Sequence, residues 1–79
     1  MTRYANRGGD SGIVAYHIEA GEIAVDFGDG WRYVYTASSA GAPNVARMHT
    51  LARAGTGLNG FINGHVRDDF ARKTRWRRP

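Results

Sequence analysis

Residues 23–35 read IAVDF, GDG and WRYVY, and this stretch decides the fold of the 79-residue chain. Two runs of strand-forming residues flank a short glycine-rich turn, and this pattern predicts a β-hairpin. The second run places Trp31, Tyr33 and Tyr35 at alternate positions. Because successive side chains of a strand point to opposite faces, the three aromatic rings share one face.

The length of the turn determines which face that is. A three-residue loop (residues 28–30) pairs Val25 with Tyr33 and turns the aromatic rings toward the core. A two-residue turn pairs Val25 with Val34 and makes the rings a stacking platform on the opposite face. A shift of one residue exchanges the two faces. The three-residue loop is favoured, because a small core needs large apolar side chains and the alternative would turn Arg32 inward.

A further strand is predicted before this hairpin. Residues 13–19 alternate between apolar and polar positions, which is typical of a half-buried strand. A two-residue turn at residues 20–21 would pair Tyr16 with Val25 and Val14 with Phe27, so that the apolar side chains of both strands fall on one face. The result is a three-stranded antiparallel meander.

Two helices are expected to follow a loop at residues 36–42. Pro43 suits a first helical turn and Gly55 a helix end. A second helix, capped by Thr56, would continue to about Arg72. The apolar positions of the two helices recur at helical spacing, at Val45, Met48, Leu51 and Ala52 and then at Leu58, Phe61, Ile62, Val66 and Phe70. The predicted class is therefore α+β, with both helices packed on one face of the sheet.

Length and composition limit the other possibilities. The chain is short enough for one domain, with residues 1–10 expected as a flexible arm, 11–72 as the domain and 73–79 as a basic tail. The absence of cysteine excludes disulfides and thiolate metal sites. No apolar run approaches the ~20 residues that span a bilayer. We therefore expect a soluble cytoplasmic protein that makes no use of a membrane.

No catalytic or metal-binding pattern is present. His17, His49 and His65 lack the close spacing of a zinc site, and no serine accompanies a catalytic set. The side chains of Asn59 and Asn63 are expected to hold nearby backbone groups. We therefore expect a protein that is not an enzyme and that carries no metal or cofactor.

The charge is concentrated at one end of the chain. The formal net charge is +4, and residues 67–79 supply all of it, because they hold six cationic and two acidic side chains. Basic segments with interleaved aromatic residues are typical of nucleic-acid binding. The candidate binding residues are Arg72, Lys73, Arg75, Trp76, Arg77 and Arg78, together with Tyr33 and Tyr35 if their rings are exposed. The alternative for the basic residues is a solvated, disordered end.

Several short motifs occur together in residues 11–70: Ser11-Gly12-Ile13, Val25-Asp26-Phe27 before a glycine turn, Tyr33-Val34-Tyr35, and GTGLNGFIN at residues 55–63. In this combination the chain resembles the KTSC domain family, named for the C-terminal segment of some lysyl-tRNA synthetases. Members also occur as free-standing small proteins in bacteria and phages. The resemblance implies RNA binding through the synthetase connection.

Two functional hypotheses follow. The first is a small non-enzymatic module that binds RNA or single-stranded nucleic acid. The second is a protein-interaction or self-associating module, such as a homodimer, because a short open sheet has two unpaired edges that invite pairing with another chain.

Overall fold

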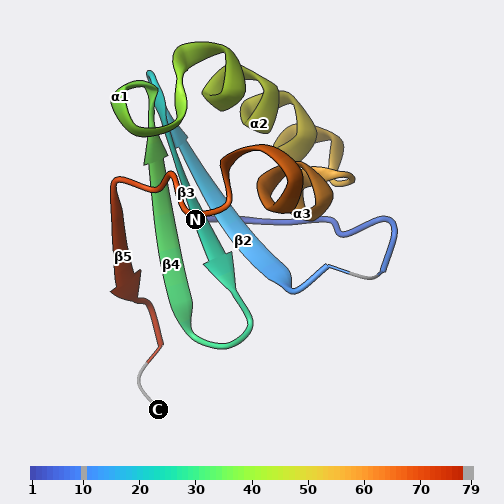
Figure 1. The fold of residues 1–79 in the computed structure, drawn as a ribbon. Helices are drawn as coiled ribbons and strands as arrows, with labels where there is room; N and C mark the ends of the chain where they lie inside the picture. The colour runs from blue at the N-terminus through green and yellow to red at the C-terminus, as the bar shows by residue number, and fades with distance from the viewer. Residues whose placement is uncertain (10, 78–79) are drawn as a thin grey trace.

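A computed structural model describes residues 1–9 and 11–77 (Figure 1). Five antiparallel strands form one sheet in the order of the chain: β1 (Thr2–Arg3), β2 (Ile13–Glu19), β3 (Glu22–Phe27), β4 (Trp31–Thr36) and β5 (Arg72–Arg75). The helical segments all lie between β4 and β5: α1 (Ala37–Ala40), α2 (Ala42–Ala54), α3 (Leu58–Phe61) and the π-helical turn η1 (Ile62–Val66). Figure 1 shows α2 and α3 on the same face of the sheet. The α+β class is confirmed, whereas the prediction of three strands is wrong.

The central hairpin adopts the register of the three-residue loop. Val25 pairs with Tyr33 and Ile23 with Tyr35. Gly30 closes the loop by donating its N–H to the Phe27 carbonyl at 3.0 Å, and its φ of 95° suits glycine. This register leaves only 1% of Tyr35 exposed, among the core side chains that α2 covers.

The hairpin of β2 and β3 is confirmed except at its far end. Tyr16 pairs with Val25 as predicted, but an irregularity between Ile13 and Ala15 pairs Ile13 with Phe27. A β-bulge places an extra residue on one strand and exchanges the faces beyond it. Consequently Ile13 is 2% exposed and Val14 is 40% exposed, so the prediction of a core role for Val14 is wrong.

Segments near both ends of the chain, β1 and β5, belong to the sheet. Residues 1–10 were expected to be a flexible arm, but Thr2 and Arg3 pair with β2, and Tyr4 is 4% exposed. The Tyr4 hydroxyl accepts the Leu58 N–H at 3.3 Å, which ties this end to α3.

At the other end, Arg72–Arg75 pair with β4, so the start of the predicted basic tail is an edge strand. Its pairing covers a hydrogen-bonding edge of β4 that would otherwise be open.

The first long helix matches its prediction, while the loop before it contains an extra helical turn. Gly55 ends α2 in the left-handed conformation, and its N–H donates to the Leu51 carbonyl at 3.0 Å. In α1 the Thr36 side chain accepts from the Ser39 N–H and the Ser39 side chain accepts from the Thr36 N–H. This reciprocal cap stabilises a turn that was expected to be loop.

The second helical segment is shorter than predicted. It begins after Gly57, without a side-chain cap from Thr56, and it ends at Val66. The Arg67 N–H reaches back to the Ile62 carbonyl, which widens the last turn. Ending here lets the chain reverse and run alongside β4. Phe70, predicted as helical, instead lies edge-on to the Tyr33 ring at 5.1 Å between centroids.

An ion pair with a buried carboxylate and a partly exposed arginine lies on the face of the sheet opposite the aromatic core. Asp26 is 2% exposed and pairs across the strands with Arg32. The Arg32 Nε donates to Asp26 Oδ1 at 2.6 Å and Nη2 donates to Oδ2 at 2.9 Å. These hydrogen bonds raise the pKa of the Arg32 guanidinium. The bidentate geometry satisfies both carboxylate oxygens of the buried group.

No helix within residues 1–9 and 11–77 combines the length and the apolar character that a bilayer crossing needs.

We expect Arg32→Ala to lower the free energy of unfolding by about 3 kcal/mol, because the Asp26 carboxylate would stay buried without its partner. Urea denaturation measures the change. Arg72→Ala is the matched control, since the Arg72–Glu22 contact spans 3.6 Å and joins an exposed arginine to a half-buried glutamate. Its effect should stay within ~0.5 kcal/mol. Equal losses in the two variants would contradict the role given to the Asp26 pair.

Candidate nucleic-acid interface

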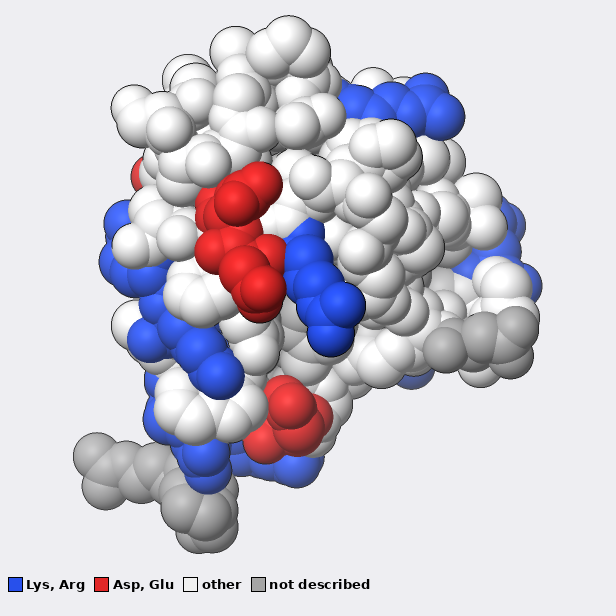
Figure 2. Space-filling view, in the orientation of Figure 1, with Lys and Arg blue, Asp and Glu red and all other residues white. Residues whose placement is uncertain are grey.

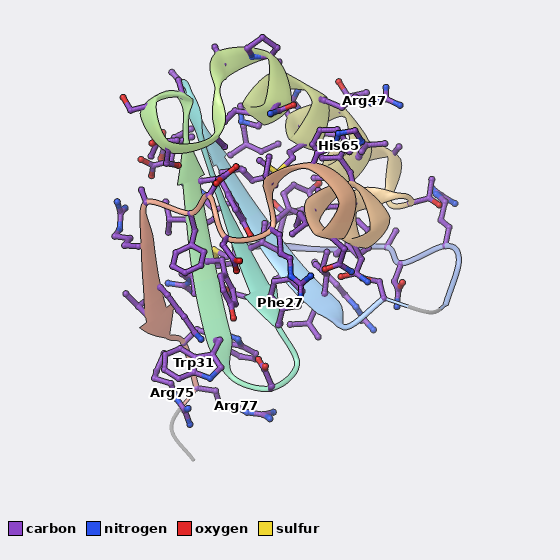
Figure 3. All side chains as sticks on the ribbon, viewed as in Figure 1. Phe27, Trp31, Arg47, His65, Arg75 and Arg77 are labelled. Carbon is purple, nitrogen blue, oxygen red and sulfur yellow. The ribbon has the colours of Figure 1, made fainter. Side chains whose placement is uncertain are left out.

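The pairing of β5 with β4 brings cationic side chains beside aromatic rings. Lys73 pairs with Tyr33, and Arg75 pairs with Trp31. Directly paired residues lie on the same face of a sheet. Figure 3 shows Trp31 and Arg75 together at the lower corner of β4 and β5. The sheet therefore assembles charge and aromatic surface that are about forty residues apart in the sequence.

The cations lie over the rings at short range. The Lys73 ammonium is 4.4 Å from the centre of the Trp31 ring and 5.2 Å from that of Tyr33. The Arg75 guanidinium is 4.6 Å from the Trp31 ring. Cation–π attraction operates within about 6 Å and contributes about 0.5–1 kcal/mol at exposed sites. These contacts orient both side chains along the exposed strand.

The residues after β5 are fastened to the turn between β3 and β4. The Trp76 indole N–H donates to the Phe27 carbonyl at 2.7 Å, and the Trp76 backbone N–H donates to the Gly30 carbonyl at 2.9 Å. Arg77 donates to the Gly28 carbonyl at 2.9 Å, and its guanidinium is 5.5 Å from the Trp76 ring. These hydrogen bonds hold the chain in place after β5, and Arg77 extends the row of cations beyond the strand.

We call Lys73, Arg75 and Arg77 the basic stripe. Figure 2 shows cationic side chains along this side of the molecule, from about mid-height to its lower end. All three residues are exposed. They form a continuous positive border on the edge of the sheet.

Most of the residues predicted from the sequence meet at this corner. Tyr33, Lys73, Arg75, Trp76 and Arg77 lie together, and Arg78 lies outside the described residues. Trp31 was not chosen as a binding residue, although the alternation of Trp31 with Tyr33 was the signal that could have identified it.

Two predicted residues do not join the corner. Alternation along β5 turns Arg72 to the opposite face, where it contacts Glu22. Tyr35 is buried, and its hydroxyl donates to the Arg67 carbonyl at 3.1 Å. Burial, followed by the nearby Tyr33, Asp68 and Asp69, raises the pKa of Tyr35. Tyr35 therefore lacks the exposed ring that stacking on a base requires, and exposure was the condition for its predicted role.

A cleft adjoins the basic stripe on the helix-covered face. Its volume is about 210 Å³, and it is lined by Phe27, Asp29, Tyr33, Tyr35, Ile62, Asn63, Arg67 and Asp68. The Phe27 and Tyr33 rings meet edge to face with 5.4 Å between centroids. Figure 2 shows acidic side chains on this face, next to the cationic border. The cleft thus combines aromatic walls with polar groups of both charges.

Metal ligation has no geometric support in the described part of the chain. Within residues 1–9 and 11–77, no three histidine or acidic side chains come close enough together to hold an ion. His17 contacts Glu19 at 2.7 Å, and a ring nitrogen of His49 lies 2.8 Å from the Glu22 carbonyl oxygen. Two of the three histidines therefore have partners within the fold.

Comparison with known proteins gave no match to this chain. No protein family model, no curated protein and no solved structure matches it. The resemblance to the KTSC domain stays a prediction that rests on the motifs of the sequence.

We expect Tyr35→Phe to lower the free energy of unfolding by about 1 kcal/mol at pH 7, because it removes the hydrogen bond to the Arg67 carbonyl. The raised pKa of Tyr35 means that the fold favours the neutral phenol. Its contribution is therefore complete below the unfolded pKa of ~10 and is lost as the pH rises above it. The difference in the free energy of unfolding between the wild type and Tyr35→Phe should therefore vanish above that pH.

Urea denaturation at pH 7 and at alkaline pH tests this expectation. Tyr16→Phe is the control, since the Tyr16 ring is buried and no hydrogen bond of its hydroxyl is found within the described residues. It should change the stability at pH 7 by less than ~0.5 kcal/mol. If the loss of stability in Tyr35→Phe stayed constant with pH, the stabilising role given to the neutral Tyr35 hydroxyl would be refuted.

Proposed function

We propose that this protein is a small, non-enzymatic module that binds RNA or single-stranded nucleic acid along β5. The observation that carries the proposal is the row of cations on an edge strand, with aromatic rings directly beside it. A cytoplasmic location belongs to the same proposal, since a chain without cysteine suits a reducing compartment.

The stripe matches the repeating charge of a phosphate backbone. Lys73 and Arg75 are two residues apart on a strand, which separates their backbones by about 7 Å. Arg77 extends the row and is held by the Gly28 carbonyl. Each cation that neutralises a phosphate releases a counterion, so the resulting affinity depends on salt.

The aromatic residues favour single strands over duplexes. Trp31 and Tyr33 are partly exposed beside the stripe. Proteins that bind single strands combine a basic track for the backbone with rings on which bases stack. A duplex keeps its bases stacked on one another and leaves such rings without a partner.

The positive charge on β5 argues against the alternative function, self-association through the edges of the sheet. The outer side of β5 is the open edge of the sheet, and three of its four residues are cationic. Two copies that paired through this edge would bring like charges together, a device that natural sheets use against edge pairing. The opposite edge, β1, is only two residues long. The edge strands therefore favour nucleic acid as the partner.

Charge substitutions test the proposal better than truncation. Removing residues 73–79 would remove most of β5 and expose the edge of β4, so a loss of binding would also reflect damage to the sheet. Substitutions on the exposed strand leave its backbone pairing in place.

We expect the wild type to bind a mixed-sequence single strand at low salt and to lose about 20-fold in affinity between 50 and 200 mM salt, as three phosphate contacts imply. The double variant Lys73→Gln/Arg75→Gln should bind more weakly and reduce the slope of log K against log salt by about 1.4. Fluorescence anisotropy across a salt series gives both values.

The matched control for the double variant is Arg47→Gln/Arg53→Gln, which removes two exposed cations from α2 and should leave the slope unchanged. The proposal fails if the wild type shows no binding at low salt, or if the two double variants behave alike.

For the full chain, we expect a monomer in sedimentation at high protein concentration and low salt, because the repulsion along β5 is strongest there. A stable dimer under these conditions would support the protein-interaction alternative.

A further inference from the structure

One aromatic residue lines the cleft and also contacts the basic stripe. Tyr33 lines the cleft, and its ring also carries the Lys73 ammonium at 5.2 Å. A nucleotide whose phosphate contacts Lys73 therefore has its base next to the mouth of the cleft. This continuity is the first reason to assign the cleft to the base of a bound strand.

The size of the cleft suits one flat heterocycle. Its volume of about 210 Å³ exceeds the ~30 Å³ share of a single water several times over. It is smaller than the ~300–1,000 Å³ of pockets that hold drug-sized ligands. Phe27 and Tyr33 provide aromatic surface on one side, and Ile62 provides apolar surface on another.

Two acidic residues line the cleft against one basic residue, Arg67, and this balance disfavours a phosphate and favours a base with hydrogen-bond donors. The Asp29 and Asp68 carboxylates line the cleft and would repel an anion. Asp29 is also oriented, because its Oδ1 accepts the Trp31 N–H at 3.1 Å. The phosphates therefore belong on the stripe and the base belongs in the cleft.

The polar lining selects among the bases. Guanine presents, on one edge, an acceptor at O6 followed by two adjacent donors at N1 and N2. Arg67 offers donors for O6, and its neighbour Asp68 offers two acceptor oxygens for the N–H groups. Adenine would place its N1 acceptor against a carboxylate, and uracil has a single ring donor between two carbonyls.

We propose that the cleft between β4 and η1 binds the guanine base of a single strand whose phosphates contact the basic stripe. Arg67 and Asp68 read its hydrogen-bonding edge, and Phe27 and Tyr33 contact the ring. This inference rests on the proposed binding of nucleic acid and adds base preference to it.

The experiment compares two labelled octanucleotides at 50 mM salt by fluorescence anisotropy. The first consists of uridines only, and the second is the same strand with a guanosine at the fourth position. The wild type should bind the guanosine-containing strand about tenfold more tightly, the range expected for a bidentate base contact. Replacing that guanosine with inosine removes the N2 amino group and should reduce the preference.

Asp68→Asn should reduce the preference to less than twofold without weakening the binding of the uridine strand, because it removes an acceptor and a negative charge. Asp69→Asn is the matched control: it changes the charge equally at the adjacent exposed residue, which does not line the cleft. It should keep the tenfold preference.

The outcomes separate this inference from the function on which it rests. Equal, salt-dependent binding of both strands by the wild type would overturn the guanine site and leave the basic stripe in place. Equal loss of preference in Asp68→Asn and Asp69→Asn would also overturn the site. Failure of both strands to bind at low salt would overturn the site and the proposed function together.

Discussion

The pairing of Val25 with Tyr33 is the constraint on which the rest of the molecule depends. The three-residue loop between β3 and β4 sets it, and it fixes both faces of the sheet at once. On one face it buries Tyr35 beneath the helices. On the other it places Arg32 opposite Asp26, where the two side chains form a bidentate pair. A shift of one residue would reverse both placements, and no helix could then cover an apolar surface.

The same register explains which parts of the fold could be predicted from the sequence. The hairpins and α2 carry apolar residues at regular spacing, because each buries one side against the core. Strand β5 buries neither side: its four residues are all exposed, so its sequence RKTR has no apolar alternation to detect. Its pairing depends on the free edge of β4, which is a tertiary property. The bulge at Ile13 was missed for a related reason, since simple alternation gives no sign of an extra residue.

The sequence predicted most of the residues of the candidate site but not how they are arranged in space. The charge count at the end of the chain identified Lys73, Arg75 and Arg77, because net charge does not depend on the fold. It could not reveal that alternation along β5 would turn Arg72 away from them toward Glu22. Trp31 joined the site only because β5 pairs alongside it. The cleft was equally hidden, since Arg67 and Asp68 line it together with Tyr33 only because the helical segment ends early, at Val66.

For the proposed binding of nucleic acid, an ordered cationic edge differs energetically from a free tail. A disordered segment loses conformational entropy when it binds, whereas β5 has already lost it on folding. In the free protein, Lys73 and Arg75 lie over the Trp31 ring, and each exposed cation–π contact contributes about 0.5–1 kcal/mol. Stacking of a base contributes about 1–3 kcal/mol, so a base can displace them from the ring. In the proposed complex, the displaced cations would then contact phosphates of the same strand, so that one bound nucleotide would replace contacts that the free protein makes with itself.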